Sequence, residues 1–457
     1  MAEQQLKEVA SVQDSGAAEE VVGGASASKK DLSELLSSFG GFNAVRGFLP
    51  DADNMNPAKK AAKNVFLTDK RFAVKREDLA RDIKGWLELL DEDHDSVTDL
   101  VEACAQKEAK YNKLLDQGIT DALYATANLE RSYRSADMFF KCANTDKAKN
   151  IRFINVYKDD IADDDSGFIN EVDNLLKGGF DRLSLKDCYS ILNIPGSVFQ
   201  DKTTLLRWAK VAFKYKVMLV TDHADEFTVD DLQENTEGYK DSDIELQNVV
   251  MTANWLVGRS AEKRSVDEAD NAAFFVPASA ALAGKLYDES SNMAQGAGGK
   301  KYGTLDGVKG VKLDLLKSEI AALMDNQVIP MVYSEGRVMA FNNTTLYNGD
   351  NTAMKEYSIV RVFDWVKKVL MNYVHEVALE NWDPYNSPKQ LKANIQAFLN
   401  KYKGYGNLFQ NYEIKEPSQD PVTKRITCDI SLTPFYAAKN FVIKVSADKS
   451  DKDAVMS

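Results

Sequence analysis

The sequence predicts an α/β fold in which a mixed sheet core has flanking helices, a helical block precedes it, and strands close the chain. In the middle of the chain, nearly continuous apolar stretches such as Val217–Thr221 alternate with helical patterns such as Thr203–Tyr215, which is typical of a buried, mostly parallel sheet. Before residue 147, apolar residues recur at helical spacing. Near the C-terminus, apolar and polar residues alternate with a period of two, which indicates strands with one buried face.

Length and composition indicate a multidomain globular protein. The chain has 457 residues, 44% of them hydrophobic and 28% charged, and its formal net charge is −13. Such a surface repels phosphate backbones, so we expect no nucleic-acid partner. No apolar run approaches the roughly 20 residues of a membrane span, and the first ten residues lack the apolar core of a signal peptide. Four widely separated cysteines predict neither disulfides nor a CxxC metal site, so we expect a cytoplasmic protein.

Residues 1–60 are rich in Ala, Ser, Gly, Glu and Lys, and we expect most of them to be disordered. One short helix is predicted within this arm, over Asp31–Phe39. Its apolar face is formed by Leu32, Leu35, Leu36 and Phe39. Such a helix is either a docking peptide on a flexible arm or packs back on its own domain, and the sequence leaves both readings open.

A helical block is predicted over residues 61–147. Its helices are expected at Glu77–Leu90, Val97–Leu115 and Ile119–Ala143, with the last two split near Gly118.

The α/β body is predicted over residues 148–415, with a loop-rich insertion at about 222–310. We expect loops at Asp222–Asp243, Gly258–Asn271 and Met293–Gly310. The expected strands are Ile151–Tyr157, Cys188–Ile194, Val217–Thr221, Phe274–Pro277 and a hairpin of Val328–Val332 with Val338–Phe341. The expected helices are Gly167–Leu176, Thr203–Tyr215, Leu313–Met324 and Tyr357–Leu379, the last being the longest.

Residues 416–457 are predicted to be a linker followed by two strands, with Pro434 between them. A two-stranded hairpin is marginal alone, and one at a chain end can take its partners from another chain. This pattern indicates assembly, so we expect the strands to complete an intermolecular sheet. The residues that we expect to build it are Ile426, Cys428, Ile430, Leu432, Phe441, Ile443 and Val445.

The sequence offers little catalytic chemistry. His223 follows a strand, where open α/β sheets bind ligands, but no nucleophile motif or acid–base partner accompanies it. The other histidines, His94 and His375, lie in an acidic helix end and on a long helix. The glycine-rich stretch before Lys300 fails the P-loop pattern, because Ala294 and Lys301 stand where Gly and Ser or Thr are needed. We expect no catalytic residue, cofactor site or metal site.

A capped helix with a basic face is predicted shortly before the terminal strands. Ser387-Pro388-Lys389-Gln390 has the pattern of a capping box, and the helix is expected to run to Lys403. Its polar face, with Lys389, Lys392 and Lys403, contains no acidic residue. This is either an ordinary solvated face or a contact surface for an acidic partner.

Several motifs, in order, resemble the large sheath subunit of the type VI secretion system, the TssC family. Leu129-Glu130-Arg131-Ser132-Tyr133-Arg134-Ser135-Ala136 is similar to that family's L-E-x-x-W-R-x-L helix, with Tyr133 and Ala136 replacing Trp and Leu. The segment 151–158, the arginine-containing helix 358–367 and the closing strands from Ile426 to Val445 are similar to its later elements. The family's Pro-Tyr-Gly segment is not evident, and its Gly-Asn-Ala-Ala helix has become Pro277-Ala278-Ser279-Ala280-Ala281. The resemblance therefore suggests a divergent, Bacteroidota-type branch.

The resemblance implies a structural role in a Gram-negative bacterium. It implies pairing with a small TssB-like subunit, helical polymerisation around an Hcp-like tube attached to baseplate proteins, and contraction that propels the tube and effectors out of the cell. It also implies recycling by a ClpV-type AAA+ ATPase, which we expect to read the helix at Asp31–Phe39, and a tube-facing role for Lys389, Lys392 and Lys403. The alternatives are a phage-like or extracellular contractile injection sheath and, third, an α/β enzyme that uses His223.

Overall fold

The structure is a computed structural model, and it describes residues 69–91, 96–145, 150–163, 166–182, 188–196, 199, 201–260, 273–288, 292–376 and 381–438. The chain divides into two compact units, Met1–Gly118 and Ile119–Ser457. The predicted helix at Asp31–Phe39 and the expected strand residues Phe441, Ile443 and Val445 lie outside the described residues.

The described part of the first unit is helical. The short 3-10 helix η1 (Lys70–Phe72) leads into α5 (Ala73–Asp91), and α6 (Val97–Cys142) begins in this unit and ends in the second. The predicted break near Gly118 is wrong, because α6 runs through this residue without interruption. Gly118 is exposed, and a Cβ placed on it would have no neighbouring atom within 4 Å. A glycine there costs about 1 kcal/mol relative to alanine, which the surrounding helix-forming residues tolerate. It follows that α6, not the predicted Tyr357–Leu379, is the longest described helix.

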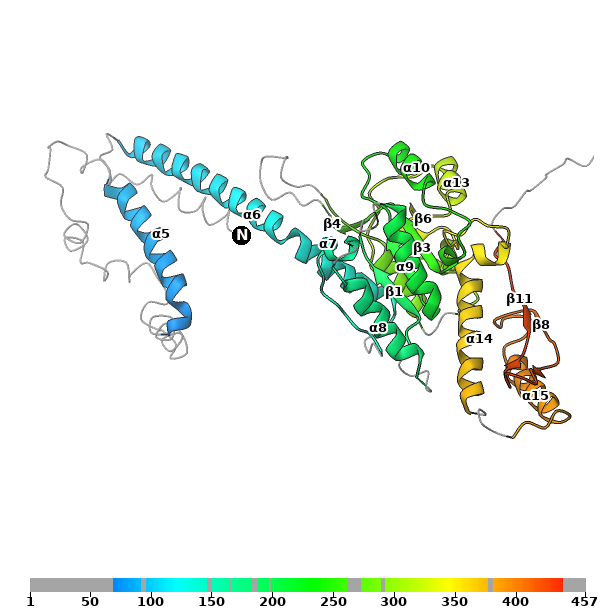
Figure 1. Cartoon of the computed structure of the whole chain (residues 1–457). Helices are drawn as coiled ribbons and strands as arrows, with labels where there is room; N and C mark the ends of the chain where they lie inside the picture. Colours follow the sequence, from blue (N-terminus) through cyan, green and yellow to red (C-terminus); the bar gives the residue numbers. More distant parts are fainter. Residues whose placement is uncertain are drawn as a thin grey trace, which may run out of the picture. The chain divides into compact units, whose positions relative to one another are not determined.

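The second unit is built on a five-stranded mixed sheet (Figure 1). Its strand order is β1-β2-β3-β6-β7; the first four strands are parallel, and β7 pairs antiparallel with β6. The strands are β1 (Ile191–Ile194), β2 (Met218–Asp222), β3 (Val249–Ala253), β6 (Ile329–Ser334) and β7 (Arg337–Ala340). A mixed sheet core is thus confirmed.

Helices cover both faces of this sheet. On β2, Leu219 faces one apolar cluster, whereas Met218 and Val220 face a second, as the period of two requires. The first cluster includes side chains of α8 (Phe168–Phe180), α9 (Lys202–Tyr215), α10 (Val229–Glu237) and α13 (Lys317–Asp325). The second includes side chains of α11 (Ser279–Tyr287), the end of α6 and the start of α14 (Tyr357–Glu376). Burial on both faces explains why the strand sequences are continuously apolar.

A smaller C-terminal module follows α14 and has a third apolar cluster of its own. It contains α15 (Ser387–Asn400) and two short antiparallel pairs, β8 (Asn411–Ile414) with β11 (Ile430–Thr433), and β9 (Ser418–Gln419) with β10 (Ile426–Thr427). Val362 and Val366 of α14 pack in the same cluster as Ile395 and Leu399 of α15. The remaining elements are α7 (Lys158–Ala162), α12 (Gly299–Tyr302), η3 (Ile244–Asn248), η5 (Thr352–Lys355) and the pair of β4 (Leu256–Arg259) with β5 (Phe274–Val276).

Three further expectations are corrected. The segment Ile151–Tyr157 is not assigned to a strand, because a strand needs a partner and none of the described strands pairs with it. The predicted loop Asp222–Asp243 contains α10, whose first turn is capped by the Thr228 hydroxyl accepting from the Asp231 N–H at 3.1 Å. The helix expected from Leu313 begins only at Lys317.

The carboxylate of Asp222 connects three parts of the body at the end of β2. It accepts hydrogen bonds from the Gly196 N–H (2.8 Å), the Thr252 hydroxyl (2.6 Å) and both the N–H (2.7 Å) and hydroxyl (2.5 Å) of Ser279. Asp222 is buried, and burial raises its pKa while these hydrogen bonds act in the opposite direction. One side chain therefore fixes the turn after β1, the end of β3 and the start of α11.

We predict that Asp222→Asn destabilises the chain by about 1–3 kcal/mol, because all four partners are donors and the new amide nitrogen cannot accept from any of them. Urea denaturation followed by circular dichroism measures the change in unfolding free energy. Asp225→Asn is the control, because Asp225 forms only a partly exposed ion pair with Lys312 and should cost at most about 1 kcal/mol. Unchanged stability of Asp222→Asn would contradict this role.

Candidate assembly surfaces

The carboxyl-terminal half of α6 is joined to the β4–β5 pair by a charged network. Glu130 accepts from the Nε atoms of Arg134 (2.8 Å) and Arg259 (3.0 Å), and Arg134 Nη1 donates to the Gly258 carbonyl at 2.7 Å. The side chains of Glu130, Arg134 and Arg259 are only 16%, 29% and 21% exposed. Burial alone would raise the pKa of Glu130, but the hydrogen bonds from the two arginines outweigh it and hold this pKa below its ordinary value.

The neighbouring side chains of the same motif divide between packing and exposure. The Arg131 guanidinium lies 5.6 Å from the Trp255 ring centroid and 5.3 Å from that of Phe274, within cation–π range. Leu129 and Tyr133 are instead exposed to solvent. The polar residues of Leu129–Ala136 therefore attach α6 to the body, and its largest apolar residues face outward.

A close approach of backbone fixes α6 against α11. A Cβ placed on Gly284 would lie 2.3 Å from the carbonyl oxygen of Phe139, so only glycine fits where the two helices cross. Arg361 of α14 adds a further connection, because its Nη2 donates to the Leu286 carbonyl at the end of α11 at 2.6 Å. The arginine-containing helix predicted from the sequence thus binds directly to the body.

The structure places four of the expected strand residues in the C-terminal module. The stretch from Ile426 to Leu432 forms two short strands, β10 and β11, and not one. Ile426 pairs with Gln419, whereas Ile430 pairs with Ile414 and Leu432 with Tyr412. Cys428, Ile430 and Leu432 are partly buried against the third apolar cluster. Within this chain, β11 therefore has a partner along one edge.

The three lysines of the expected basic ridge do not share one helix. Lys389 is exposed and Lys392 partly buried on α15, whereas α15 ends at Asn400 and Lys403 lies in the following turn. Lys403 Nζ lies 5.5 Å from the ring centroid of Tyr412. After the helix has ended, Gly404, with φ +107°, lies in a turn in which the Leu408 N–H donates to the Tyr402 carbonyl at 3.0 Å.

The expected capping box at Ser387 is also wrong. The helix is preceded by Asn386, which makes no side-chain cap, and the Ser387 hydroxyl accepts from the Asp383 N–H at 2.9 Å. Pro388 is the second residue of α15, in the first turn, where its missing N–H leaves no donor unpaired.

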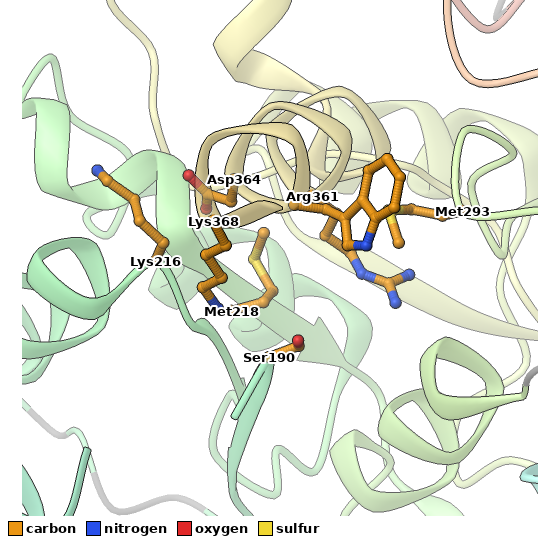
Figure 2. A pocket seen from close by; sticks show the side chains of 8 residues that line it. Ser190, Lys216, Met218, Met293, Arg361, Asp364 and Lys368 are labelled. Carbon is orange, nitrogen blue, oxygen red and sulfur yellow. The ribbon is translucent and has the colours of Figure 1, made fainter. Parts of the chain in front are cut away.

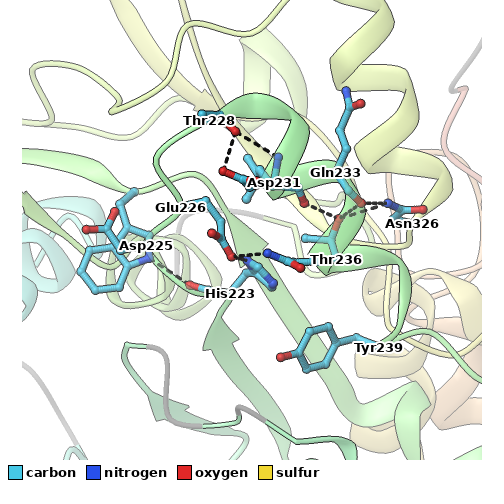
Figure 3. Close-up of polar contacts among 12 residues, drawn as sticks. His223, Asp225, Glu226, Thr228, Asp231, Gln233, Thr236, Tyr239 and Asn326 are labelled. Atoms are coloured by element: carbon cyan, nitrogen blue, oxygen red, sulfur yellow. Dashed lines mark hydrogen bonds and ion pairs between the residues drawn. The ribbon is translucent and has the colours of Figure 1, made fainter.

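His223 is buried and lies beside Glu226 and Tyr239 (Figure 3). Its Nδ1 is 3.8 Å from a carboxylate oxygen of Glu226 and has no hydrogen-bond partner, while its ring packs edge-on to Tyr239 with centroids 5.6 Å apart. Burial lowers its pKa, although the nearby Glu226 carboxylate acts in the opposite direction. The histidine therefore packs inside the fold, and its carbonyl accepts from the Trp255 indole at 2.9 Å.

A small pocket lies beside α14 (Figure 2), with a volume of about 80 Å³. Its lining includes three cations and one carboxylate, and burial lowers the pKa of Lys368 while it raises that of Asp364. Lys368 Nζ donates to the Tyr189 carbonyl (2.8 Å), and Asp364 accepts from the Asn248 amide (2.7 Å). These contacts connect α14 to the residues just before β1 and β3. The residues that line the pocket are Ser190, Lys216, Met218, Met293, Arg361, Asp364, Trp365 and Lys368.

Two searches of the described residues bear on other kinds of site. Among them, no three His, Cys, Asp or Glu side chains gather so as to hold a metal ion. None of the helices in the described ranges is both long and apolar enough to span a bilayer.

Three parts of one protein family match the chain in succession. Residues 29–119 match the family described as TssC/VipB-like, N-terminal region; residues 121–348 match Type VI secretion system TssC/VipB, central domain; and residues 356–457 match TssC/VipB-like, C-terminal domain. The junction of the first two matches lies next to the boundary between the two units after Gly118. No curated protein matches the chain.

Chains of contractile assemblies are among the similar solved structures. The contracted helical sheath of the anti-feeding prophage is 14% identical, with 62% of this chain and 75% of that chain covered and a TM-score of 0.46. The contracted PVC sheath of an extracellular contractile injection system is 16% identical, with coverages of 54% and 68% and a TM-score of 0.41. A chain of the anti-feeding prophage baseplate is 14% identical, with 54% of this chain and 66% of that chain covered and a TM-score of 0.40. This chain therefore spans about two thirds of the length of that baseplate chain.

We predict that Glu130→Gln destabilises the second unit by about 1.5–3 kcal/mol at pH 7, because it leaves two partly buried arginines without their counter-charge. The folded pKa of Glu130 is depressed, so its contribution is present above the unfolded value near 4.5 and is lost as the pH falls through the lower folded value. The difference between wild type and variant, measured by urea denaturation, should therefore shrink below about pH 4.5.

Glu88→Gln is the matched control for this prediction, since Glu88 forms only an exposed pair with Lys84. A Glu130→Gln effect that is equally small, or that does not change with pH, would contradict the role of the network.

Proposed function

Because this chain belongs to the TssC/VipB family of the type VI secretion system, we propose that it is the large subunit of a two-component sheath that pairs with a small TssB-like subunit. As a member of this family it is a structural subunit of a contractile sheath. The observation that carries the proposal is that family matches follow one another over residues 29–457 in the order N-terminal region, central domain and C-terminal domain. The matches therefore include all three named parts of the family, and not one shared domain.

The proposed sheath polymerises helically on a baseplate around an Hcp-like tube in the cytoplasm of a Gram-negative bacterium. Contraction, in this proposal, propels the tube and its effectors out of the cell. Such a device needs subunits with two packed arrangements, joined by segments that stay paired while the bodies move. We further assign recycling to a ClpV-type AAA+ ATPase that binds Leu32, Leu35, Leu36 and Phe39, residues outside the described part of the chain.

The terminal strands are our proposed connectors between subunits. In support, β11 uses one edge for β8, so the other edge can accept a strand from another chain. The alternation at Phe441, Ile443 and Val445 provides a further strand pattern directly after this module. Because β11 belongs to the chain's own fold, the residues after Ala438 are the ones that a test should remove.

We predict that truncation after Ala438 leaves a folded subunit that still binds the small sheath subunit but no longer forms tubes. Wild type co-expressed with that subunit should form sheath tubes visible by electron microscopy, whereas wild type alone should not. Truncation after Lys449, which spares the strand pattern at Phe441–Ser446, is the control and should assemble.

Two results would contradict these assignments separately. Tubes from the chain alone would favour a one-protein contractile sheath. Normal tubes from the chain truncated after Ala438 would leave the two-component sheath intact and reject the terminal strands as connectors.

The basic side chains Lys389, Lys392 and Lys403 are our proposed contacts to the inner tube. Lys389 and Lys403 are exposed and the protein has a net charge of −13, so a local basic surface suits a partner of opposite charge. Exposed ion pairs contribute about 0–1 kcal/mol each and exchange readily with water. Repeated around every ring, such contacts can hold the tube and still release it.

We predict that changing all three lysines to Glu abolishes tube-templated sheath assembly while leaving the heterodimer and its melting temperature unchanged. Wild-type assembly on the tube should already weaken as salt rises, because exposed charges are screened over about 10 Å at 0.1 M salt. Lys355→Glu is a single-site control away from α15. A triple variant that forms extended sheath on the tube as efficiently as wild type would show that these lysines are only solvated.

A further inference from the structure

The pocket beside α14 contains more positive than negative charge. Its lining includes Lys216, Arg361 and Lys368 but a single carboxylate, that of Asp364. This carboxylate accepts from the Asn248 amide, and burial raises its pKa, which favours its neutral form. It therefore neutralises at most one of the three cations, and at least two positive charges remain.

Arg361 and Lys368 have no ion-pair partner among the carboxylates of the described residues. Arg361 Nη2 donates to the Leu286 carbonyl, Lys368 Nζ donates to the Tyr189 carbonyl, and the Cys188 thiol also lies beside Lys368. These acceptors are neutral, and a guanidinium with five N–H donors has others left. Lys368 is only 7% exposed. A cation so far from water normally has an anion beside it, because its desolvation is costly.

The two head groups lie on one side of α14. Residues seven apart on a helix are almost in line, two turns from each other. Figure 2 shows Arg361 and Lys368 extending toward Ser190, whereas Lys216 extends away from it. Ser190 is exposed, so solvent reaches the pocket at this residue. The other lining side chains are two methionines and a tryptophan, and an apolar lining strengthens the attraction between charges.

We propose that this pocket binds one inorganic oxyanion of the size of phosphate, held by Arg361 and Lys368 with Ser190 at the opening. Guanidinium and ammonium groups are the side chains that bind such ions most strongly. The volume of about 80 Å³ is larger than the about 10–15 Å³ that one water needs. It is also well below the about 300–1,000 Å³ of pockets for larger organic ligands, so a nucleotide does not fit.

Titration of the full-length chain with inorganic phosphate, in chloride buffer at constant ionic strength, tests the site. Isothermal titration calorimetry should show one ion bound per chain. Lys368→Met keeps an apolar stem but removes the ammonium, and we expect it to bind phosphate at least about tenfold more weakly than wild type. Lys367→Met is the matched control and should bind as wild type does, because Lys367 is exposed and does not line the pocket.

Ser190→Asp tests the same site without removing either cation. The new carboxylate would lie at the opening of the pocket and supply the missing negative charge, so it should exclude the ion. We expect Ser190→Asp to bind phosphate at least about tenfold more weakly than Ser190→Asn, an uncharged control of the same shape. Because an ion that binds only the folded chain stabilises it, phosphate should raise the melting temperature of Ser190→Asn more than that of Ser190→Asp. General effects of phosphate on protein stability act on both variants and cancel in this comparison.

The inference is overturned if wild type binds no phosphate at millimolar concentration, or if Lys367→Met loses as much affinity as Lys368→Met. Equal affinity of Ser190→Asp and Ser190→Asn would also overturn it. None of these measurements requires sheath assembly, so their outcome is independent of the proposed two-component sheath.

Discussion

The body of this protein depends on satisfying a single buried carboxylate. Asp222 ends the central strand β2, and its two oxygens accept from donors on the turn after β1, on β3 and on α11. Because each donor would otherwise be buried without a partner, the three elements are fixed relative to one another. The helices that contact α11 take their positions from this arrangement. Gly284 allows α6 to cross α11 closely, and Arg361 attaches α14 to the end of α11.

This arrangement explains how surfaces for assembly are held by a rigid core. The network of Glu130, Arg134 and Arg259 uses the polar side of α6 to bind the body, which leaves Leu129 and Tyr133 facing outward. The start of α14 packs in the second apolar cluster, and its following residues share a third cluster with α15. Leu129 and Tyr133 therefore lie on the surface, where another subunit can reach them.

Sequence patterns predicted the helices and strands whose apolar residues recur with a regular period. The β2 strand, α9, the β6–β7 hairpin and α14 all follow from apolar periodicity, because burial imposes that periodicity directly. Elements that depend on particular partners were missed. Sequence reasoning singled out His223, which follows β2, whereas the adjacent Asp222 makes the hydrogen bonds that join the elements. Neighbouring residues of a strand point to opposite faces of the sheet. Only the structure shows which of these faces has hydrogen-bond donors. Lys403 was placed on α15 because helical spacing continues past Asn400, but α15 ends at Asn400 and Lys403 lies in the turn that follows.

The order of strands in the sheet has a consequence for synthesis on the ribosome. β3 pairs on one edge with β2 and on the other with β6, which comes about 75 residues later in the chain. At a typical translation rate of 5–20 residues per second, the second edge of β3 stays open for about 4–15 s after it emerges. During that interval β3, an apolar strand, has one edge without a hydrogen-bonding partner. Such an edge is open to pairing with the nascent chain of a neighbouring ribosome on the same messenger RNA. The length of chain between β3 and β6 thus sets how long this edge of β3 stays open during synthesis.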